Sequence, residues 1–186
     1  MALTRIGTSA YSTLDATKLS GNLPAISGSS LTGITTGKIL QVTSTSVSSQ
    51  VTTTSGTHAD ISGYTLSITP SATSSKILFM CYIQYYFFDS DAQNGCSTKI
   101  LRNIDGGTYS NLSAQSGGVS NIASDVDGSV SGNNAGLDAP TITIIDSPNT
   151  TGVVNYKMQG AVAWGGTAKY GYDSMTGYLI AQEIGA

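Results

Sequence analysis

Alternating apolar and polar positions recur along the chain from residue 38 onward and predict a succession of β-strands. Lys38–Ser44 and Tyr64–Thr69 alternate with a period of two, the spacing at which successive side chains point to opposite faces of a sheet. The nearly continuous apolar run Lys76–Phe88 is expected to be the longest strand, buried on both faces. The same pattern predicts strands at Ser97–Asn103, Thr141–Asp146, Val153–Val162 and Tyr178–Ile184.

Clusters of turn-forming residues separate these predicted strands. They are Pro70–Thr73, Asp105–Gly107, Ser147–Asn149 and Gly165–Gly166, which combine the residue types that tight turns require. No stretch long enough for a helix shows both helical periodicity and capping residues. Many short strands without intervening helices predict an all-β fold, and we expect one jelly-roll-like β-sandwich over residues 38–186.

The stretch Ser113–Ala139 interrupts this strand pattern. It has few large apolar residues and is rich in Gly, Asn and Ser. We expect either a long surface excursion or a pair of irregular strands joined by an exposed loop. Long loops on a rigid β-framework often carry binding residues.

Residues 1–37 form a different kind of segment, in which single aliphatic residues are separated by Ser, Gly, Thr, Asn and Pro. These aliphatic residues are Leu14, Leu19, Leu23, Ile26, Leu31 and Ile34. No helical period survives, and Gly and Pro break any strand. One chain could not bury such isolated side chains, whereas three parallel copies could point them at a shared axis. We therefore predict an extended attachment and trimerisation segment, with a disordered leader as the alternative.

The composition excludes several classes of function. Charged residues are only 10% of the chain and the net charge is −3, whereas ordinary domains carry about 25% charged residues. The eight Lys and Arg residues are scattered, so no basic footprint for nucleic acid is present. The longest apolar run is too short for a membrane helix, and the first residues do not resemble a secretion signal. Cys81 lies within an apolar run and is expected to be a buried thiol.

Candidate catalytic and metal-binding residues do not form a recognisable constellation. His58 is the only histidine, and a Ser–His–Asp triad would need three groups that converge in space. Asp89–Gly95 resembles a calcium loop, but Ile100 stands where such a loop requires a bidentate Glu, so a hairpin turn is favoured. We expect no enzyme activity, no cofactor and no metal.

An aromatic stretch near the C-terminus is the best candidate for a binding surface. Trp164, Tyr170 and Tyr172 lie close together in the sequence, beside Asp173. Exposed Trp and Tyr side chains anchor interfaces and stack on sugar rings. The alternative for these three residues is packing in the core or between subunits. The aromatic residues of Lys76–Phe88 are expected in the core and in a trimer interface.

Several segments resemble bacteriophage tail-fibre and head-fibre proteins. The residues that carry the resemblance are LSGNLPAISGSSLTGI (19–34), GKILQV (37–42), SITPSATSSKILFM (67–80), IIDSPNTTGVVNYKMQ (144–159) and YLIAQEIGA (178–186). The resemblance spans nearly the whole chain, and its first and third segments are the most specific in combination.

The resemblance implies a homotrimer located on the virion, with a thin N-terminal part and a C-terminal β-sandwich. The function it implies is that of a structural fibre protein, attached by its N-terminal segment and presenting the β-domain to the host surface, including a cell-surface glycan. The alternative is a capsid-decorating cement or head-fibre protein that stabilises the phage head. A third hypothesis is a monomeric carbohydrate-binding module.

Overall fold

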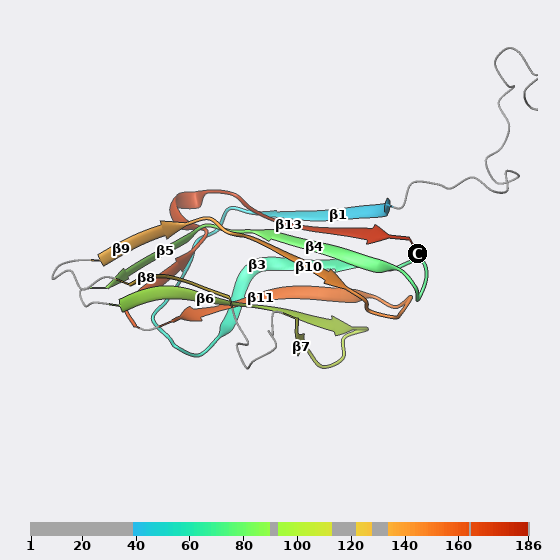
Figure 1. The fold of residues 1–186 in the computed structure, drawn as a ribbon, viewed down its shortest axis with the longest axis horizontal. Coiled ribbons are helices and arrows are strands. Elements are labelled where there is room, and N and C mark those ends of the chain that lie inside the picture. The colour runs from blue at the N-terminus through green and yellow to red at the C-terminus, as the bar shows by residue number, and fades with distance from the viewer. Residues whose placement is uncertain (1–38, 90–92, 113–121, 128–133, 164, 186) are drawn as a thin grey trace, which may run out of the picture. The chain divides into compact units, whose positions relative to one another are not determined.

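The fold is a β-sandwich, seen here in a computed structural model that describes residues 39–89, 93–112, 122–127, 134–163 and 165–185 (Figure 1). Its strands form three antiparallel sheets. Sheet 1 has the order β1-β13-β4-β10, with bounds Ile39–Val47, Gly177–Ile184, Lys76–Tyr82 and Thr141–Asp146. Sheet 2 has the order β3-β11-β6-β7, with β8 also paired to β6; the bounds are Ala59–Ile68, Val154–Val162, Gln93–Ile104, Ser110–Asn111 and, for β8, Ile122–Asp127. Sheet 3 has the order β2-β12-β5-β9, with bounds Val51–Thr53, Thr167–Tyr170, Tyr85–Asp89 and Asn134–Asp138.

Sheets 1 and 3 are two halves of one layer. Each strand of sheet 3 is the chain neighbour of the strand at the same place in sheet 1: β2 follows β1, β12 precedes β13, β5 follows β4 and β9 precedes β10. The four links lie side by side, since the Gly171 N–H donates to the Gln84 carbonyl (2.9 Å) and the Ile83 N–H to the Pro140 carbonyl (3.4 Å). The layer therefore bends along one line that all four links share.

Sheet 2 forms the opposite layer of the sandwich (Figure 1). The chain passes repeatedly from one layer to the other: β3 of sheet 2 comes between β2 and β4, and β11 of sheet 2 comes between β10 and β12. This alternation is typical of a jelly roll and confirms the predicted all-β, jelly-roll-like sandwich. The single 3-10 turn among the described residues, Tyr172–Ser174, lies in the link between β12 and β13.

The core between the layers is formed by every second residue of the paired strands. Phe79 of β4 stacks on Tyr156 of β11 with ring centroids 4.8 Å apart, and Tyr85 of β5 meets Tyr170 of β12 edge to face at 5.4 Å. Both Cys81 and Cys96 are buried free thiols, as expected for Cys81. Burial raises the pKa of each cysteine to about 12, so both stay protonated at neutral pH.

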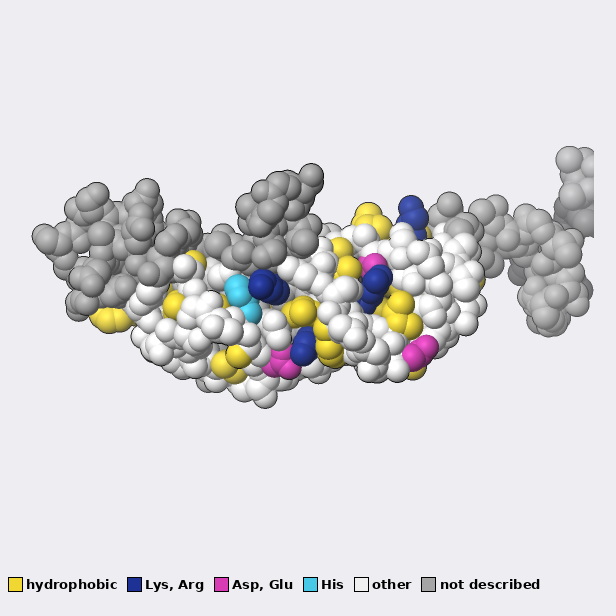
Figure 2. All heavy atoms as spheres, turned by 90° about the horizontal axis from the view of Figure 1, so that it is seen from below, with side chains coloured by type: hydrophobic (Ala, Val, Ile, Leu, Met, Phe, Trp, Pro, Cys, Tyr) yellow, Lys and Arg dark blue, Asp and Glu magenta, His cyan; other side chains and the backbone are white. Residues whose placement is uncertain are grey.

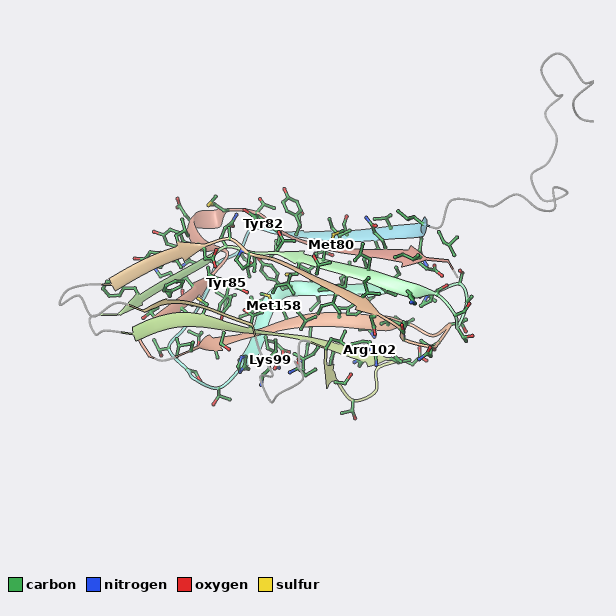
Figure 3. The ribbon with its side chains drawn as sticks, viewed as in Figure 1. Met80, Tyr82, Tyr85, Lys99, Arg102 and Met158 are labelled. Carbon is green, nitrogen blue, oxygen red and sulfur yellow. The ribbon has the colours of Figure 1, made fainter. Side chains whose placement is uncertain are left out.

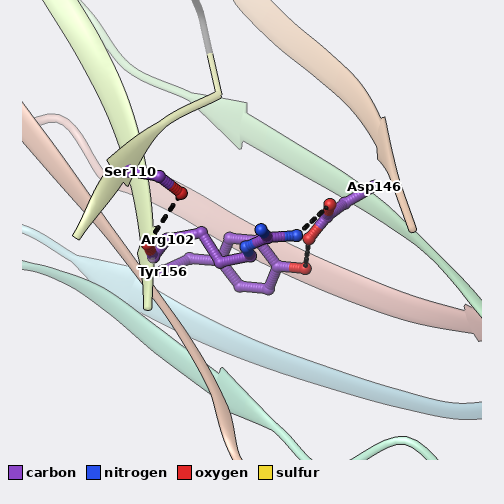
Figure 4. A network of polar contacts seen from close by, with 4 residues as sticks. All are labelled: Arg102, Ser110, Asp146 and Tyr156. Atoms are coloured by element: carbon purple, nitrogen blue, oxygen red, sulfur yellow. Dashed lines mark hydrogen bonds and ion pairs between the residues drawn. The ribbon is translucent and has the colours of Figure 1, made fainter. Parts of the chain in front are cut away.

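Asp146 joins the two layers through polar contacts (Figure 4). This carboxylate, at the end of β10, accepts hydrogen bonds from Arg102 Nη1 of β6 (2.7 Å) and from Tyr156 Oη of β11 (2.8 Å). Burial, followed by the neighbouring Asp146 charge, raises the pKa of Tyr156, so its hydroxyl remains a proton donor. A buried carboxylate needs such partners, because removing one of them leaves an uncompensated charge.

At two positions only glycine fits, because an aromatic side chain of the facing layer lies directly against the backbone. A Cβ on Gly177 would lie 2.1 Å from the Tyr64 hydroxyl, and a Cβ on Gly160 would lie 2.4 Å from the Tyr170 ring. Neither contact can be relieved locally, because Tyr64 and Tyr170 are themselves fully buried. A side chain larger than hydrogen at either position would force the layers apart.

The structure confirms most predicted strands and corrects two expectations. Thr141–Asp146 and Tyr178–Ile184 are strands, but Lys76–Phe88 is divided at Ile83–Gln84 and only alternate residues of β4 are fully buried. The strands on either side of Asp89–Gly95, β5 and β6, belong to different sheets, so the prediction that they form a hairpin is wrong. The stretch Ser113–Ala139 contains two strands, as the second of its two predicted alternatives has it, and β8 pairs with β6 while β9 pairs with β5.

Glu183 of β13 fixes the loop between β3 and β4. Its buried carboxylate accepts hydrogen bonds from the Ser71 N–H (2.7 Å), Ser71 Oγ (2.6 Å), Ser75 Oγ (2.7 Å) and Gln41 Nε2 (2.6 Å). Burial alone would raise the pKa of this carboxyl, but the four donors lower it to about 2. The charged form is therefore the one that the fold stabilises.

We predict that Glu183→Gln lowers the free energy of unfolding by about 2 kcal/mol at pH 7, because the amide turns one acceptor into a donor that faces other donors. The folded-state pKa of Glu183 lies below its ordinary value of 4.5. Its contribution is therefore complete above about pH 4.5 and is lost as pH falls toward 2. Urea unfolding of both proteins between pH 7 and pH 2 measures this difference, which should shrink toward the acid end.

Asp60→Asn is the matched control for this prediction. The Asp60 side chain is 58% exposed and is paired with Lys157 at 2.8 Å, and exposed ion pairs contribute about 1 kcal/mol at most. An equal loss of stability in both variants, or a Glu183→Gln difference that does not change with pH, would contradict the assigned role.

Candidate functional site

The outer face of sheet 1 carries more apolar than polar side chains, although it points away from the core, and its polar residues are uncharged. The strand registers align its side chains in rows across the sheet, so that Val42, Gln182, Leu78 and Ile145 form one row, Ser44, Ile180, Met80 and Thr143 the next, and Ser46, Tyr178, Tyr82 and Thr141 a third. Met80 and Tyr82 are labelled in Figure 3. We call these three rows, together with Leu40, the apolar face.

The sequence produces the apolar face because β4 and β13 carry apolar residues on both sides. In β4, Ile77, Phe79 and Cys81 point into the core, while Leu78, Met80 and Tyr82 point outward. The edge strands extend the surface, with exposed fractions of 56% for Val42 and 65% for Ile145. Contiguous exposed apolar surface of this kind marks an interaction site rather than a solvent-facing side.

The outer face of sheet 2 is different, because its polar side chains satisfy one another. Ser67 Oγ donates to Asn155 Oδ1 (2.6 Å), whose Nδ2 donates to Asn103 Oδ1 (2.8 Å). Lys157 pairs with Asp60 at 2.8 Å and lies 4.1 Å from the centre of the Tyr109 ring. Figure 2, seen from this side, shows Lys, Arg, Asp, Glu and His side chains distributed over the surface. This face is therefore suited to water.

A second candidate site lies on the outer face of sheet 3. Tyr86 and Phe88 of β5 and Thr167 and Lys169 of β12 line an open hollow of about 270 Å³. Tyr86 stacks on Tyr172 with ring centroids 4.3 Å apart and an interplanar angle of 13°. We call these five residues the aromatic pocket.

The predicted binding residues are only partly brought together. Tyr172 belongs to the aromatic pocket, while Trp164 lies outside the described residues, as do Leu14, Leu19, Leu23, Ile26, Leu31 and Ile34 of the predicted attachment segment. The expectation for Tyr170 is wrong, because this residue is completely buried. Its hydroxyl accepts from the Ala161 N–H (2.9 Å) and donates toward the Ser97 carbonyl (2.7 Å).

The residues that sequence reasoning missed in this site are Tyr86, Phe88, Thr167 and Lys169. From the sequence alone, Tyr86 and Phe88 are expected among the core and interface aromatics, and no strand is predicted at Thr167–Tyr170. The alternation inside Tyr85–Phe88 is the signal that separates inward Tyr85 and Phe87 from outward Tyr86 and Phe88. It could not be read because all four residues are aromatic.

His58 forms a pair with Ser97 without the third member of a triad among the described contacts. His58 Nε2 lies 2.9 Å from Ser97 Oγ, while nearby Asp60 is engaged by Lys157 and Gln159. Partial burial and then the Lys99 charge lower the pKa of His58, which keeps its ring neutral at pH 7. Ser97 is 2% exposed, so its hydroxyl is not open to a substrate, and the pair serves to join β6 to the segment before β3.

No group of three or more His, Cys, Asp or Glu side chains in the described part of the chain is arranged to hold a metal ion. Within the same residues, no helix has the length and hydropathy needed to cross a membrane.

No protein-family model and no curated protein matches the chain. Among solved structures, it is similar to infectious bursal disease virus Gt strain, with 12% identity and a TM-score of 0.37, over 78% of this chain and 38% of that one. The T=1 particle derived from infectious bursal virus gives 14% identity and a TM-score of 0.38, over 88% and 41% of the two chains. Eiger TNF from S. frugiperda gives 8% identity and a TM-score of 0.35, over 78% and 94%. The chain spans about two fifths of the viral chains, and similarity this distant assigns no function.

Proposed function

We propose that this chain is a virion fibre protein of a bacteriophage, a homotrimer without enzyme activity. Residues 1–37 attach it to the particle, and the β-sandwich of residues 38–186 faces the host surface. The observation that carries the proposal is the apolar face of sheet 1. A particle protein that functions in several copies needs such a surface, whereas an isolated binding module does not.

The composition of the apolar face favours another copy of the same chain as its partner. In a closed trimer the residues nearest the three-fold axis meet their own copies, so a charge there would meet like charges. The three rows of the apolar face contain no Asp, Glu, Lys or Arg. Their exposed apolar side chains include Val42, Ile145 and Tyr178, which would be covered in the assembly.

The prediction of three copies in the assembly rests on the sequence rather than on the structure of the β-sandwich. The spaced aliphatic residues of 1–37 need a shared axis to be buried, and the segments 19–34 and 67–80 resemble those of trimeric phage fibres. The low charge of the whole chain agrees with packing against identical copies. Together these features support a trimer built on parallel chains.

We predict that light scattering of the purified chain gives a native mass three times the 19.0-kDa chain mass. Val42→Asp or Ile145→Asp should shift this mass toward that of the monomer, because burying an unpaired carboxylate in the interface costs several kcal/mol. Both positions are more than half exposed in the single chain, so circular dichroism should show an unchanged fold.

Thr65→Asp is the control for these variants, since Thr65 is an exposed position in β3, on sheet 2. It should leave the native mass unchanged. A monomer for the unmodified chain would contradict the trimer and favour the isolated binding module. Dissociation by Thr65→Asp alone would place the interface on sheet 2.

We further predict that antibody against the β-sandwich labels the tail of intact particles and blocks their adsorption to host cells. Label over the head with unimpaired adsorption would instead support a capsid-decorating protein. Electron microscopy of gold-labelled particles, with an adsorption assay on the same preparation, makes this measurement.

A further inference from the structure

The outer face of sheet 3 carries apolar side chains that are not part of the core between the layers. The register places Thr52, Lys169, Tyr86 and Leu137 in one row across the sheet, and Leu137 is 61% exposed. The intervening residues, including Ala168 and Tyr170, supply the core on the inner side. Two adjoining positions of the next row, Thr167 and Phe88, complete the lining of the aromatic pocket.

Tyr172, which stacks on the lining residue Tyr86, is held in place by the backbone. It begins a short 3-10 turn, Tyr172–Ser174, which is entered through Gly171, with φ of 69°, and contains Asp173, with φ of 54°. The Gly171 N–H donates to the Gln84 carbonyl at the start of β5. A Cβ at Gly171 would lie 2.7 Å from the Ser49 carbonyl oxygen, so only glycine fits there. The turn therefore fixes Tyr172 against Tyr86 before any ligand arrives.

Lys169 supplies a positive charge that is not neutralised within the described part of the chain. Its Nζ lies 5.2 Å from the Tyr86 ring centre and 5.6 Å from the Tyr172 ring centre. The ion pairs found among the described residues involve Arg102 and Lys157 instead. Contact with ring faces stabilises an ammonium group without cancelling its charge. An anionic group at the pocket would thus gain an ion pair.

The aromatic pocket suits a small, flat ligand with one acidic group. Its volume of about 270 Å³ is slightly below the range for sites that enclose drug-sized ligands, which begins at about 300 Å³, and is enough for one sugar ring. The aromatic rings offer flat apolar surface to the C–H face of a sugar, the Thr167 hydroxyl can exchange hydrogen bonds with sugar hydroxyls, and Lys169 can pair with a carboxylate. A nucleic acid would need several cations along a track, and the pocket has one.

We propose that the aromatic pocket binds an acidic saccharide, a sugar unit that carries a carboxylate. The proposal rests on the host-surface recognition proposed above and names the chemistry of what is recognised. Tyr86 and Phe88, which line the hollow, provide the stacking surface, and Tyr172 supports the Tyr86 ring by stacking on it. Lys169 determines the preference for acidic over neutral sugars.

The test compares methyl β-D-glucuronide with methyl β-D-glucoside, two probes that differ in the carboxylate alone. Titration of the full chain in its native assembly, followed by NMR, should show that the glucuronide binds about fivefold more tightly, the ratio that a partly exposed ion pair supplies. Lys169→Met keeps the aliphatic stem and should abolish the difference between the probes. Tyr172→Ala should weaken both probes in proportion.

Lys157→Met is the matched control, because Lys157 also lies against a tyrosine ring, at 4.1 Å from Tyr109, on sheet 2. It should leave both affinities unchanged. The inference is overturned if neither probe binds at 10-mM concentration, a threshold about where affinity becomes negligible, or if Lys169→Met retains the preference. Adsorption of the unmodified protein to host cells separates the two proposals. Cell binding without probe binding overturns the saccharide site alone, whereas absence of cell binding overturns the proposed recognition function.

Discussion

The stack of Phe79 on Tyr156 across the core, extended by the hydrogen bond from Tyr156 to Asp146, determines which way sheet 1 faces. It joins β4 and β10 of one layer to β11 of the other, and Arg102 adds β6 to the same contact. Because side chains alternate along a strand, fixing Phe79 inward fixes Leu78 and Met80 outward. The apolar face is therefore a consequence of how the core packs. A shift of one residue in the register of β4 or β11 would turn the core side chains of that strand outward and its outward side chains into the core.

The two layers consequently present unlike surfaces. Sheet 2 carries polar groups that bind one another, such as Asn155 with Asn103 and Lys157 with Asp60. Sheet 1 carries aliphatic and aromatic groups on its outer face, and Val42, Ile145 and Tyr178 among them are exposed within the described part of the chain. A sandwich with one face suited to water and one suited to protein contact is the geometry that a closed oligomer requires, with the apolar faces turned toward the axis.

Much of the fold could be predicted from alternation, but its bends could not. Thr141–Asp146 was predicted with the bounds that β10 has, since its flanks contain Pro140 and Pro148. The break in Lys76–Phe88 was missed because Ile83–Gln84 contains no turn residue. The partners that hold this link, Pro140 and Gly171, come from distant parts of the chain. Pairing of β8 and β9 with different sheets is likewise a tertiary effect.

Prediction of the candidate site was weaker for a related reason. The apolar run of β4 indicated a buried strand, and only the structure shows that half of its side chains lie on an outer face. Tyr172 was identified as a site residue, but the buried Tyr170 was predicted together with it. A strand of four residues such as β12 is too short for its alternation to show which side chains point inward. Lys169 could not be assigned to the site from the sequence, because the two tyrosines whose rings it approaches, Tyr86 and Tyr172, are distant from each other in the sequence.

The central claim, that copies of the chain cover the apolar face, can be tested on three methionines at once. Met158 is fully buried and Met175 is 46% exposed, while Met80 lies in the middle row of the apolar face. Limited peroxide oxidation followed by mass spectrometry of peptides should find Met80 as protected as Met158 in the unmodified protein, and more reactive in Val42→Asp, with Met175 reactive in both. Equal oxidation of Met80 in the two proteins would show that the face is already open to solvent and would contradict the account.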